Sequence, residues 1–184
     1  MSIIISDAQP EDAVSARRFS VDTGMFEHEE SGEVEQQLLA VIHGQSPGTV
    51  LTAKRGSAVV GAGYFAPEPF SDRCWNLYFL VVDKDHHGLG IGSLIVSEVE
   101  QRLCDLGPSQ ARVLLIETSS TEQYANTRAF YIARGYTKEA TIRDYYGPDD
   151  TRSSTGSTCR PDGARLCGGG SPRTGGPPSL LCPR

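Results

Sequence analysis

Residues 77–99 read LYFLVVDKDHHGLGIGSLIVSEV, and this stretch decides the fold. Its first six residues are aliphatic, aromatic or β-branched, which predicts a buried strand. Apolar residues then recur at helical spacing from Ile91 to Leu103, and Gly107-Pro108 marks the expected end of that helix. Positions 88, 90 and 92 are glycines. The sequence therefore predicts a strand that enters a helix through a glycine-rich turn.

A turn of this kind is suited to bind phosphate. Glycine tolerates positive φ and lets backbone N–H groups approach a ligand, and the first turn of a helix leaves N–H groups unpaired and partly positive. Together these properties favour a diphosphate. Two common phosphate loops do not fit, because a dinucleotide fingerprint needs glycine where Ser93 stands and a Walker A loop needs a lysine after Lys84.

Two motifs carry a resemblance to a known family. The turn His87-Gly88-Leu89-Gly90-Ile91-Gly92 resembles the coenzyme A loop of the GNAT family of N-acetyltransferases, Gln/Arg-x-x-Gly-x-Gly/Ala, with His87 where the family has Gln or Arg. Residues 126–136, NTRAFYIARGY, resemble the family's Asn-x-x-Ala-x-x-Phe-Tyr-x-x-x-Gly-Phe/Tyr helix. The two motifs stand in the family's order, with a predicted strand at 113–117 between them. The resemblance covers residues 3–146.

The resemblance implies transfer of an acetyl group from acetyl-CoA to a primary amine by direct attack in a ternary complex. It implies that the backbone of Leu80 and Val82 pairs with the pantetheine arm, and that Asn126 bonds the pantetheine or a bridging water. For Asn126, capping of the helix is the alternative. The residues expected to bind the acyl carrier are Leu80, Val82, His87, Gly88, Leu89, Gly90, Ile91, Gly92, Ser93 and Asn126.

Tyr131 and Glu117 are the candidate catalytic residues. By resemblance, Tyr131 protonates the leaving thiolate, and packing beside Phe130 is the alternative. Glu117, at the end of a predicted strand, is the candidate base, with Glu68 and a water chain as rivals. Backbone N–H groups are expected to polarise the carbonyl. The acceptor stays open between a small metabolite, an antibiotic amine and a protein terminus, and a non-catalytic coenzyme A-binding or interaction module is the alternative function.

Charge and composition restrict the classes of molecule that this chain is expected to bind. Residues 1–146 hold 12 Lys and Arg against 20 Asp and Glu, which disfavours nucleic-acid binding and favours a cationic amine. The chain has no apolar run of membrane-spanning length and no secretion signature, so we expect a soluble, cytoplasmic protein without a membrane partner. The five cysteines and the histidines lack zinc spacing, so no metal is expected. A homodimer is left open.

The periodicities predict one α/β domain over residues 1–146, a mixed sheet flanked by helices in the GNAT order. Strands are expected at 3–6, 49–54, 58–65, 73–82, 112–118 and 136–146. Helices are expected from Pro10 to about 23, around 34–42, at 91–106 and at 122–134.

Residues 147–184 differ sharply in composition, with eight Gly and six Pro in 38 residues. Such a segment buries too little apolar surface to offset its ordering entropy, so we expect disorder. The GNAT resemblance implies one more strand after residue 150, and its Lys, Val, Ile and aromatic residues are absent. We therefore expect that the final strand is missing, and we hypothesise an out-of-frame reading of a GC-rich gene. A genuine low-complexity linker is the alternative.

Overall fold

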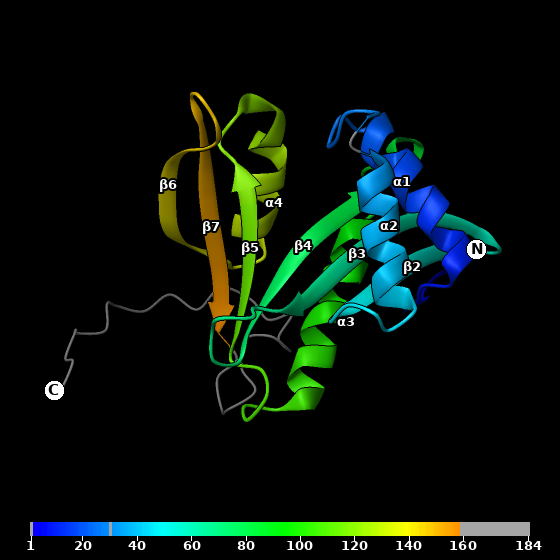
Figure 1. Ribbon diagram of the computed structural model, residues 1–184, viewed down its shortest axis with the longest axis horizontal. Helices are drawn as coiled ribbons and strands as arrows, with labels where there is room; N and C mark the ends of the chain where they lie inside the picture. The colour runs from blue at the N-terminus through cyan, green and yellow to red at the C-terminus, as the bar shows by residue number, and fades with distance from the viewer. Residues whose placement is uncertain (1, 30, 159–184) are drawn as a thin grey trace, which may run out of the picture.

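The structure, a computed structural model, describes residues 2–29 and 31–158 (Figure 1). A seven-stranded sheet lies between helices on its two faces. The elements are β1 (Ile3–Asp7), the 3-10 turn η1 (Pro10–Asp12), α1 (Ala13–Asp22), α2 (Ser31–Ile42), β2 (Thr49–Arg55), β3 (Ala58–Pro67), β4 (Cys74–Val82), η2 (Lys84–His86), α3 (Ile91–Leu106), β5 (Val113–Ser119), η3 (Glu122–Tyr124), α4 (Ala125–Ala133), β6 (Thr137–Gly147) and β7 (Asp150–Thr158).

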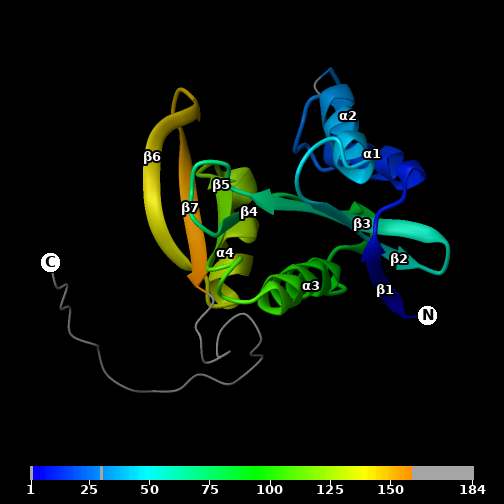
Figure 2. The ribbon, with the colours of Figure 1, turned by 60° about the horizontal axis from the view of Figure 1, so that its bottom comes forward.

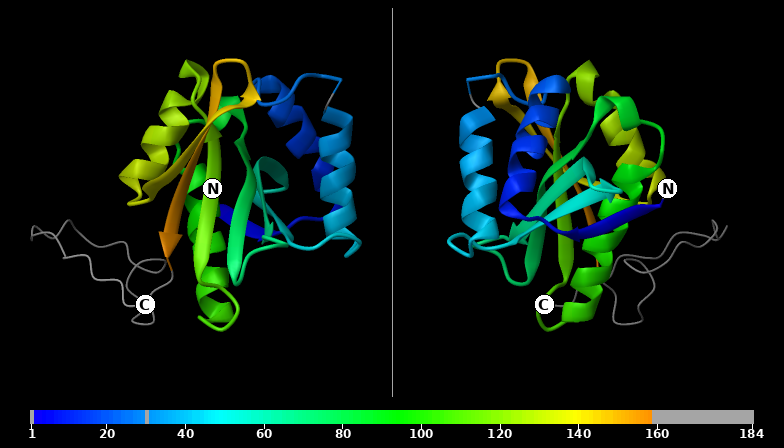
Figure 3. Two further views of the ribbon diagram at one scale, coloured as in Figure 1. Left: turned by 60° about the vertical axis from the view of Figure 1, so that its left-hand side comes forward. Right: turned by 90° about the vertical axis from the view of Figure 1, so that its right-hand side faces the viewer.

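The strand order is β1-β2-β3-β4-β5-β7-β6, and all neighbours are antiparallel except β4 and β5. This arrangement confirms the predicted mixed α/β fold. Helices α1 and α2 pack on one face against β2–β4, whereas α3 and α4 pack on the other (Figures 2 and 3). Within the described residues, no helix combines the length and the apolar character needed to cross a bilayer.

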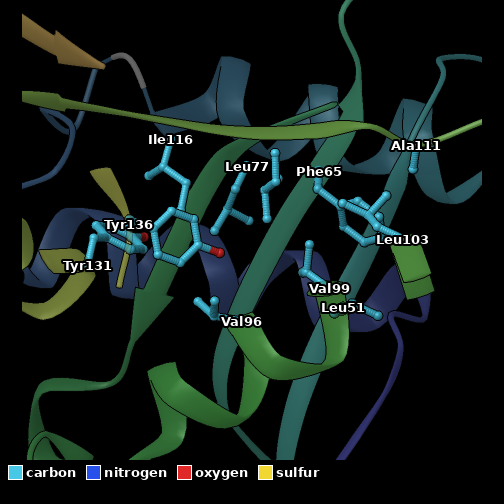
Figure 4. Packing of buried hydrophobic residues seen from close by; sticks show 11 residues of the cluster. Leu51, Phe65, Leu77, Val96, Val99, Leu103, Ala111, Ile116, Tyr131 and Tyr136 are labelled. Carbon is cyan, nitrogen blue, oxygen red and sulfur yellow. The ribbon is translucent and has the colours of Figure 1, made fainter. Parts of the chain in front are cut away.

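A bulge in β4 changes which side chains face which helices. Tyr64 pairs with Phe79 and Phe65 pairs with Leu77, so Tyr78 is an extra residue in β4. Leu77 therefore packs beneath α3, near Val96 and Tyr136 (Figure 4), while Phe79 packs under α1 and α2. In a regular strand these two residues would share one face.

Strands β4 and β5 separate shortly after they meet. They pair from Cys74 to Leu77 with Val113 to Ile116. Beyond this point β4 continues to Val82 and β5 to Ser119, and the two strands diverge (Figure 1). The edge of β4 that faces β5 is consequently left without a neighbouring strand over residues 78–82.

Strand β7 corrects the expectation that the final strand is missing. Asp150–Thr158 lies between β5 and β6 and pairs with β5 from Val113 to Ser119. Its sequence, DTRSSTGST, lacks apolar residues, but a ladder needs only backbone N–H and C=O groups. Small hydroxyl side chains fill the space, since Ser153 and Thr155 are buried and the Thr155 hydroxyl donates to the Ile116 carbonyl over 3.3 Å. Residues 159–184 lie outside the described part of the chain, so their predicted disorder and the frameshift stay predictions.

Candidate active site

A cleft of about 700 Å³ opens where β4 and β5 part. Its walls come from β4, the glycine-rich turn, η3, α4 and the segment after α1. Nine of the ten residues predicted to bind the acyl carrier line it, the exception being Leu89, whose side chain is exposed. The lining residues are Thr23, Met25, Leu80, Val81, Val82, His86, His87, Gly88, Gly90, Ile91, Gly92, Ser93, Gln123, Tyr124, Asn126, Thr127, Phe130 and Tyr131.

The glycine-rich turn places the start of α3 at the cleft. Gly88 has φ of 77° and Gly90, the N-cap of α3, has φ of 76°, values that side chains with a Cβ rarely adopt. In the described chain a Cβ at either position would meet no atom within 4 Å, so conformation rather than space requires glycine. The first helical bond runs from the Leu94 N–H to the Gly90 carbonyl over 3.1 Å. The N–H groups of residues 91–93 therefore precede the helical ladder and are available to an anion.

Tyr131 is 2% exposed and is held by aromatic contacts. Its ring meets the Phe130 and Tyr136 rings edge-on, with centroids 5.0 and 5.6 Å away. Figure 4 shows the Tyr131 and Tyr136 side chains. Burial raises the pKa of the Tyr131 phenol above its ordinary value of 10, and Arg134 opposes this only in part. The phenol therefore stays protonated at neutral pH, and it both packs in the core and lines the cleft.

A buried carboxylate, which the sequence analysis did not identify, fixes the end of α4 on α3. Glu100 accepts hydrogen bonds of 2.8 Å from the Tyr136 hydroxyl and from Arg134 Nη2. The Tyr136 N–H in turn donates to the Tyr131 carbonyl over 3.1 Å. An acidic residue among the buried positions of a helix is the signal that could have revealed it, because a buried charge needs partners.

Asn126 lies in the first turn of α4 and lines the cleft. The N-cap of this helix is Tyr124. The capping alternative for Asn126 is therefore wrong, because a cap residue has to precede the first helical residue. Its bond to the pantetheine stays a prediction.

Glu117 lies in β5, outside the residues that line the cleft. Its carboxylate forms an ion pair with Arg152 of β7, and the Arg152 guanidinium lies 4.5 Å from the centre of the Tyr145 ring. The neighbouring residue Ile116 points into the core beneath α3 and α4, so Glu117 points to the opposite face (Figure 4). A proton transferred to Glu117 would therefore have to compete with the Arg152 guanidinium for the carboxylate.

Glu68, the rival base, has a different environment. Its Oε1 accepts from Asn76 Nδ2 and from the Tyr78 hydroxyl, both over 2.9 Å. Burial, together with Glu68, raises the pKa of Tyr78. Asn76 is 1% exposed, and its Oδ1 has no hydrogen-bond partner in the described chain.

Both candidate bases lie on the face of the sheet that carries α1 and α2. Asn76, which holds Glu68, pairs with Leu115, and side chains that pair across strands share a face. Glu117 is two residues beyond Leu115 in β5, so it shares this face as well. Tyr131 lies on the other face with α3. Tyr131 lines the cleft, whereas neither Glu117 nor Glu68 is among its lining residues, so a proton that moves from the cleft to either carboxylate has to cross to this face of the sheet.

The cleft is bridged at one end by a hydrogen bond between distant parts of the chain. Gln123 Nε2 of η3 donates to the Gly24 carbonyl after α1 over 2.8 Å.

Among residues 2–29 and 31–158, no three His, Cys, Asp or Glu side chains gather where they could hold a metal ion.

A mixed sheet that parts beside a glycine-rich turn defines the class of this fold, that of the GNAT acyltransferases. A model of the Acetyltransferase (GNAT) family matches residues 14–136, and the chain belongs to this family.

Solved structures agree with this assignment. A protein of the GNAT family from Desulfovibrio desulfuricans superposes with a TM-score of 0.78 at 26% identity, over 86% of this chain and 100% of the other. Two further structures share the fold at lower identity. An aminoglycoside 6'-N-acetyltransferase complexed with coenzyme A has a TM-score of 0.68 at 18% identity, over 86% and 98% of the two chains. The ribosomal-protein-S18-alanine N-acetyltransferase from Escherichia coli has 0.69 at 15%, over 85% and 94%. A search of curated proteins finds no match.

Proposed function

We propose that this protein transfers the acetyl group of acetyl-CoA to a primary amine. The observation that carries the proposal is one continuous cleft, which runs from the first turn of α3 along the unpaired edge of β4 to Tyr131. A fold relative has been crystallised with coenzyme A, which supports the same class of ligand here.

The binding roles follow from the geometry of the cleft. The N–H groups at the start of α3 bind the diphosphate, because both their unpaired hydrogens and the helix dipole favour an anion. The pantetheine arm carries amide groups and pairs with the free edge of β4 near Leu80 and Val82 as an added strand. Asn126, on the opposite wall, reaches the same arm.

The chemistry is a direct displacement. A neutral amine attacks the thioester carbonyl, a C–N bond forms, and the C–S bond breaks as the thiolate leaves. Tyr131 donates its proton to the thiolate, and backbone N–H groups stabilise the charge on the carbonyl oxygen. The proton lost by the amine goes to Glu117 or Glu68, directly or through water. No covalent enzyme intermediate is needed, because both substrates occupy the site together.

The two carboxylates are distinguished by paired variants. If Glu117 is the base, Glu117→Gln lowers kcat/KM and removes the acidic limb of its pH profile, while Glu68→Gln leaves that limb in place. The reverse pattern assigns the role to Glu68. Retention of the limb in both variants would leave water as the acceptor.

The acceptor is an amine whose identity the fold leaves open. Fold relatives are named for aminoglycosides and for a ribosomal-protein alanine, so soluble polyamines and peptide amino termini are the two classes to test first. The acidic balance of residues 1–146 favours a cationic acceptor of either class.

A panel of amines assayed by thiol release, together with calorimetry of acetyl-CoA binding, tests the proposal. Thiol release that depends on one amine class supports it. Binding of acetyl-CoA without turnover on any amine would instead indicate a non-catalytic coenzyme A-binding module, although the presence of β7 removes the main reason for that alternative. Absence of binding would refute both functions.

A further inference from the structure

A buried ion pair lies where the end of α4 meets the middle of α3. Glu100 Oε2 accepts a hydrogen bond from Arg134 Nη2 over 2.8 Å, and Ser97 Oγ accepts from the same nitrogen over 3.1 Å. Glu100 is 8% exposed, and the Arg134 side chain is 20% exposed. Removing two charges from water costs free energy that their attraction offsets only in part, so stability alone is a weak reason for the pair. Its contacts around Tyr131 give a second reason.

The ion pair surrounds Tyr131, the proposed proton donor. Arg134 follows Tyr131 by three residues, so the two side chains leave α4 on the same side. The Arg134 N–H donates to the Tyr131 carbonyl over 3.1 Å, and the Tyr136 N–H donates to it over the same distance. The Tyr136 ring contacts the Tyr131 ring, and its hydroxyl donates to Glu100. One carboxylate of α3 therefore fixes both residues that adjoin Tyr131 at the end of α4.

Proton donation creates a charge that the surroundings of Tyr131 disfavour. When Tyr131 gives its proton to the leaving thiolate, its oxygen becomes a phenolate in a residue that is 2% exposed. Burial accordingly raises the pKa of Tyr131, whereas the positive charge of Arg134 lowers it. In the described chain Arg134 Nε has no hydrogen-bond partner, so Glu100 and Ser97 do not satisfy the whole guanidinium. Part of its charge is therefore left to act on the phenol.

Building on the proposed function, we propose that Arg134, held by Glu100 and Ser97, stabilises the Tyr131 phenolate while the thiolate leaves. In this step the C–S bond breaks with its electron pair on sulfur, the O–H bond of Tyr131 breaks, and an S–H bond forms. The phenolate then takes a proton from water, which restores the phenol for the next turnover. Arg134 is not among the residues that line the cleft and acts through Tyr131, so it is a positioning residue.

A double-mutant cycle with Tyr131→Phe tests this role on the full chain. Arg134→Gln removes the charge, and we expect it to lower kcat about tenfold. An opposite charge nearby changes the pKa of an acid by about 1 to 3, and only part of that difference appears in the rate. In the Tyr131→Phe background the same substitution should change kcat less than about twofold, because no phenolate forms there. The dissociation constant of acetyl-CoA should stay within about twofold, since the contacts proposed for the carrier are with other residues.

Three further variants separate charge from structure. Arg134→Lys keeps a positive charge on a flexible side chain and should retain kcat within about threefold. Ser97→Ala removes one anchor of the guanidinium at an exposed position of α3, and kcat should fall about two- to threefold. Arg128→Gln is the matched control on α4, where the Arg128 guanidinium donates to the Ser119 and Thr121 carbonyls. Its effect on kcat should be equal with and without the phenol.

The outcomes separate this proposal from the one it rests on. Equal losses of kcat for Arg134→Gln in both backgrounds, or a loss that Arg134→Lys shares in full, would show that Arg134 acts through structure, which overturns the inference and leaves acetyl transfer intact. If Arg134→Gln does not fold, Ser97→Ala takes its place in the cycle. A loss of kcat only where the Tyr131 phenol is present then supports the inference, and an equal or absent loss overturns it. Absence of thiol release with every amine in the unaltered protein overturns the proposed function itself.

Discussion

Replacing Tyr131 by Phe removes one hydroxyl from the cleft and leaves the aromatic packing in place. The ring is 2% exposed, and its contacts with Phe130 and Tyr136 do not use the phenol oxygen. We therefore expect the free energy of unfolding to change by less than about 1 kcal/mol. Binding of acetyl-CoA should stay within about twofold, because the contacts proposed for the diphosphate and the pantetheine are with other residues.

The catalytic effect should be much larger. A positioned general acid contributes about 10²- to 10⁴-fold to a rate. Burial raises the pKa of Tyr131, which makes it a weaker acid than a free phenol, so we expect the lower end of that range. A loss of about 100-fold in kcat corresponds to about 2.7 kcal/mol of barrier.

Steady-state thiol release gives kcat, and calorimetry gives the dissociation constant of acetyl-CoA. Tyr136→Phe is the control, since it removes a 2.8 Å hydrogen bond to buried Glu100 from the neighbouring ring. It should cost about 1.5–3 kcal/mol of stability and lower kcat less than about tenfold. Unchanged turnover in Tyr131→Phe would refute the role of the phenol as acid. Loss of acetyl-CoA binding would show that the hydroxyl acts through structure.

Three further predictions concern the turn, the tyrosines and β7. Gly90→Ala should weaken acetyl-CoA binding about tenfold and cost about 1–2 kcal/mol of stability, because the φ of Gly90 is 76°. Gly32→Ala within α2 should instead stabilise by about 0.5–1 kcal/mol, because a Cβ there meets nothing within 4 Å in the described chain. Urea unfolding measures the stability of both variants. The raised pKa values of Tyr131 and Tyr136 favour the neutral phenols in the folded state. Stability should therefore be constant up to about pH 10 and fall above it by up to about 1.4 kcal/mol per pH unit for each tyrosine, and Tyr131→Phe should reduce this slope. Ser153→Val should raise the free energy of unfolding by about 1 kcal/mol and raise the melting temperature, because the position is 4% exposed and the added methyl groups are buried there.

The sequence predicted most of the fold because its signals there are local. The positive φ values at Gly88 and Gly90 and the helical period of α3 are properties of the local backbone, and each leaves a local pattern in the sequence. Helix α3 accordingly begins and ends at the predicted residues, Ile91 and Leu106. The elements from β1 to β6 likewise agree with the expected positions to within a few residues.

Strand β7 could not be predicted from the same signals. It is stabilised by backbone pairing with β5 and β6, and its Ser and Thr residues carry no apolar alternation. A composition averaged over residues 147–184 also hid the short segment that pairs. The environment of Glu117 was missed for the same reason, because its partner Arg152 belongs to that strand. The bulge at Tyr78 has no local sequence signal either, since it depends on the register with β3.

Helix α3 serves two ends of the proposed reaction. Its first turn carries the N–H groups proposed to bind the diphosphate, and Glu100, nine residues and about 14 Å further along, holds Tyr136 and Arg134 at the end of α4. A helix is stiff along its axis, so a ligand that draws the first turn inward also displaces the anchor of the proton donor. Binding of the acyl carrier and the proposed proton transfer from Tyr131 thus both depend on the position of α3. Substitutions on the buried side of α3 are therefore expected to change both.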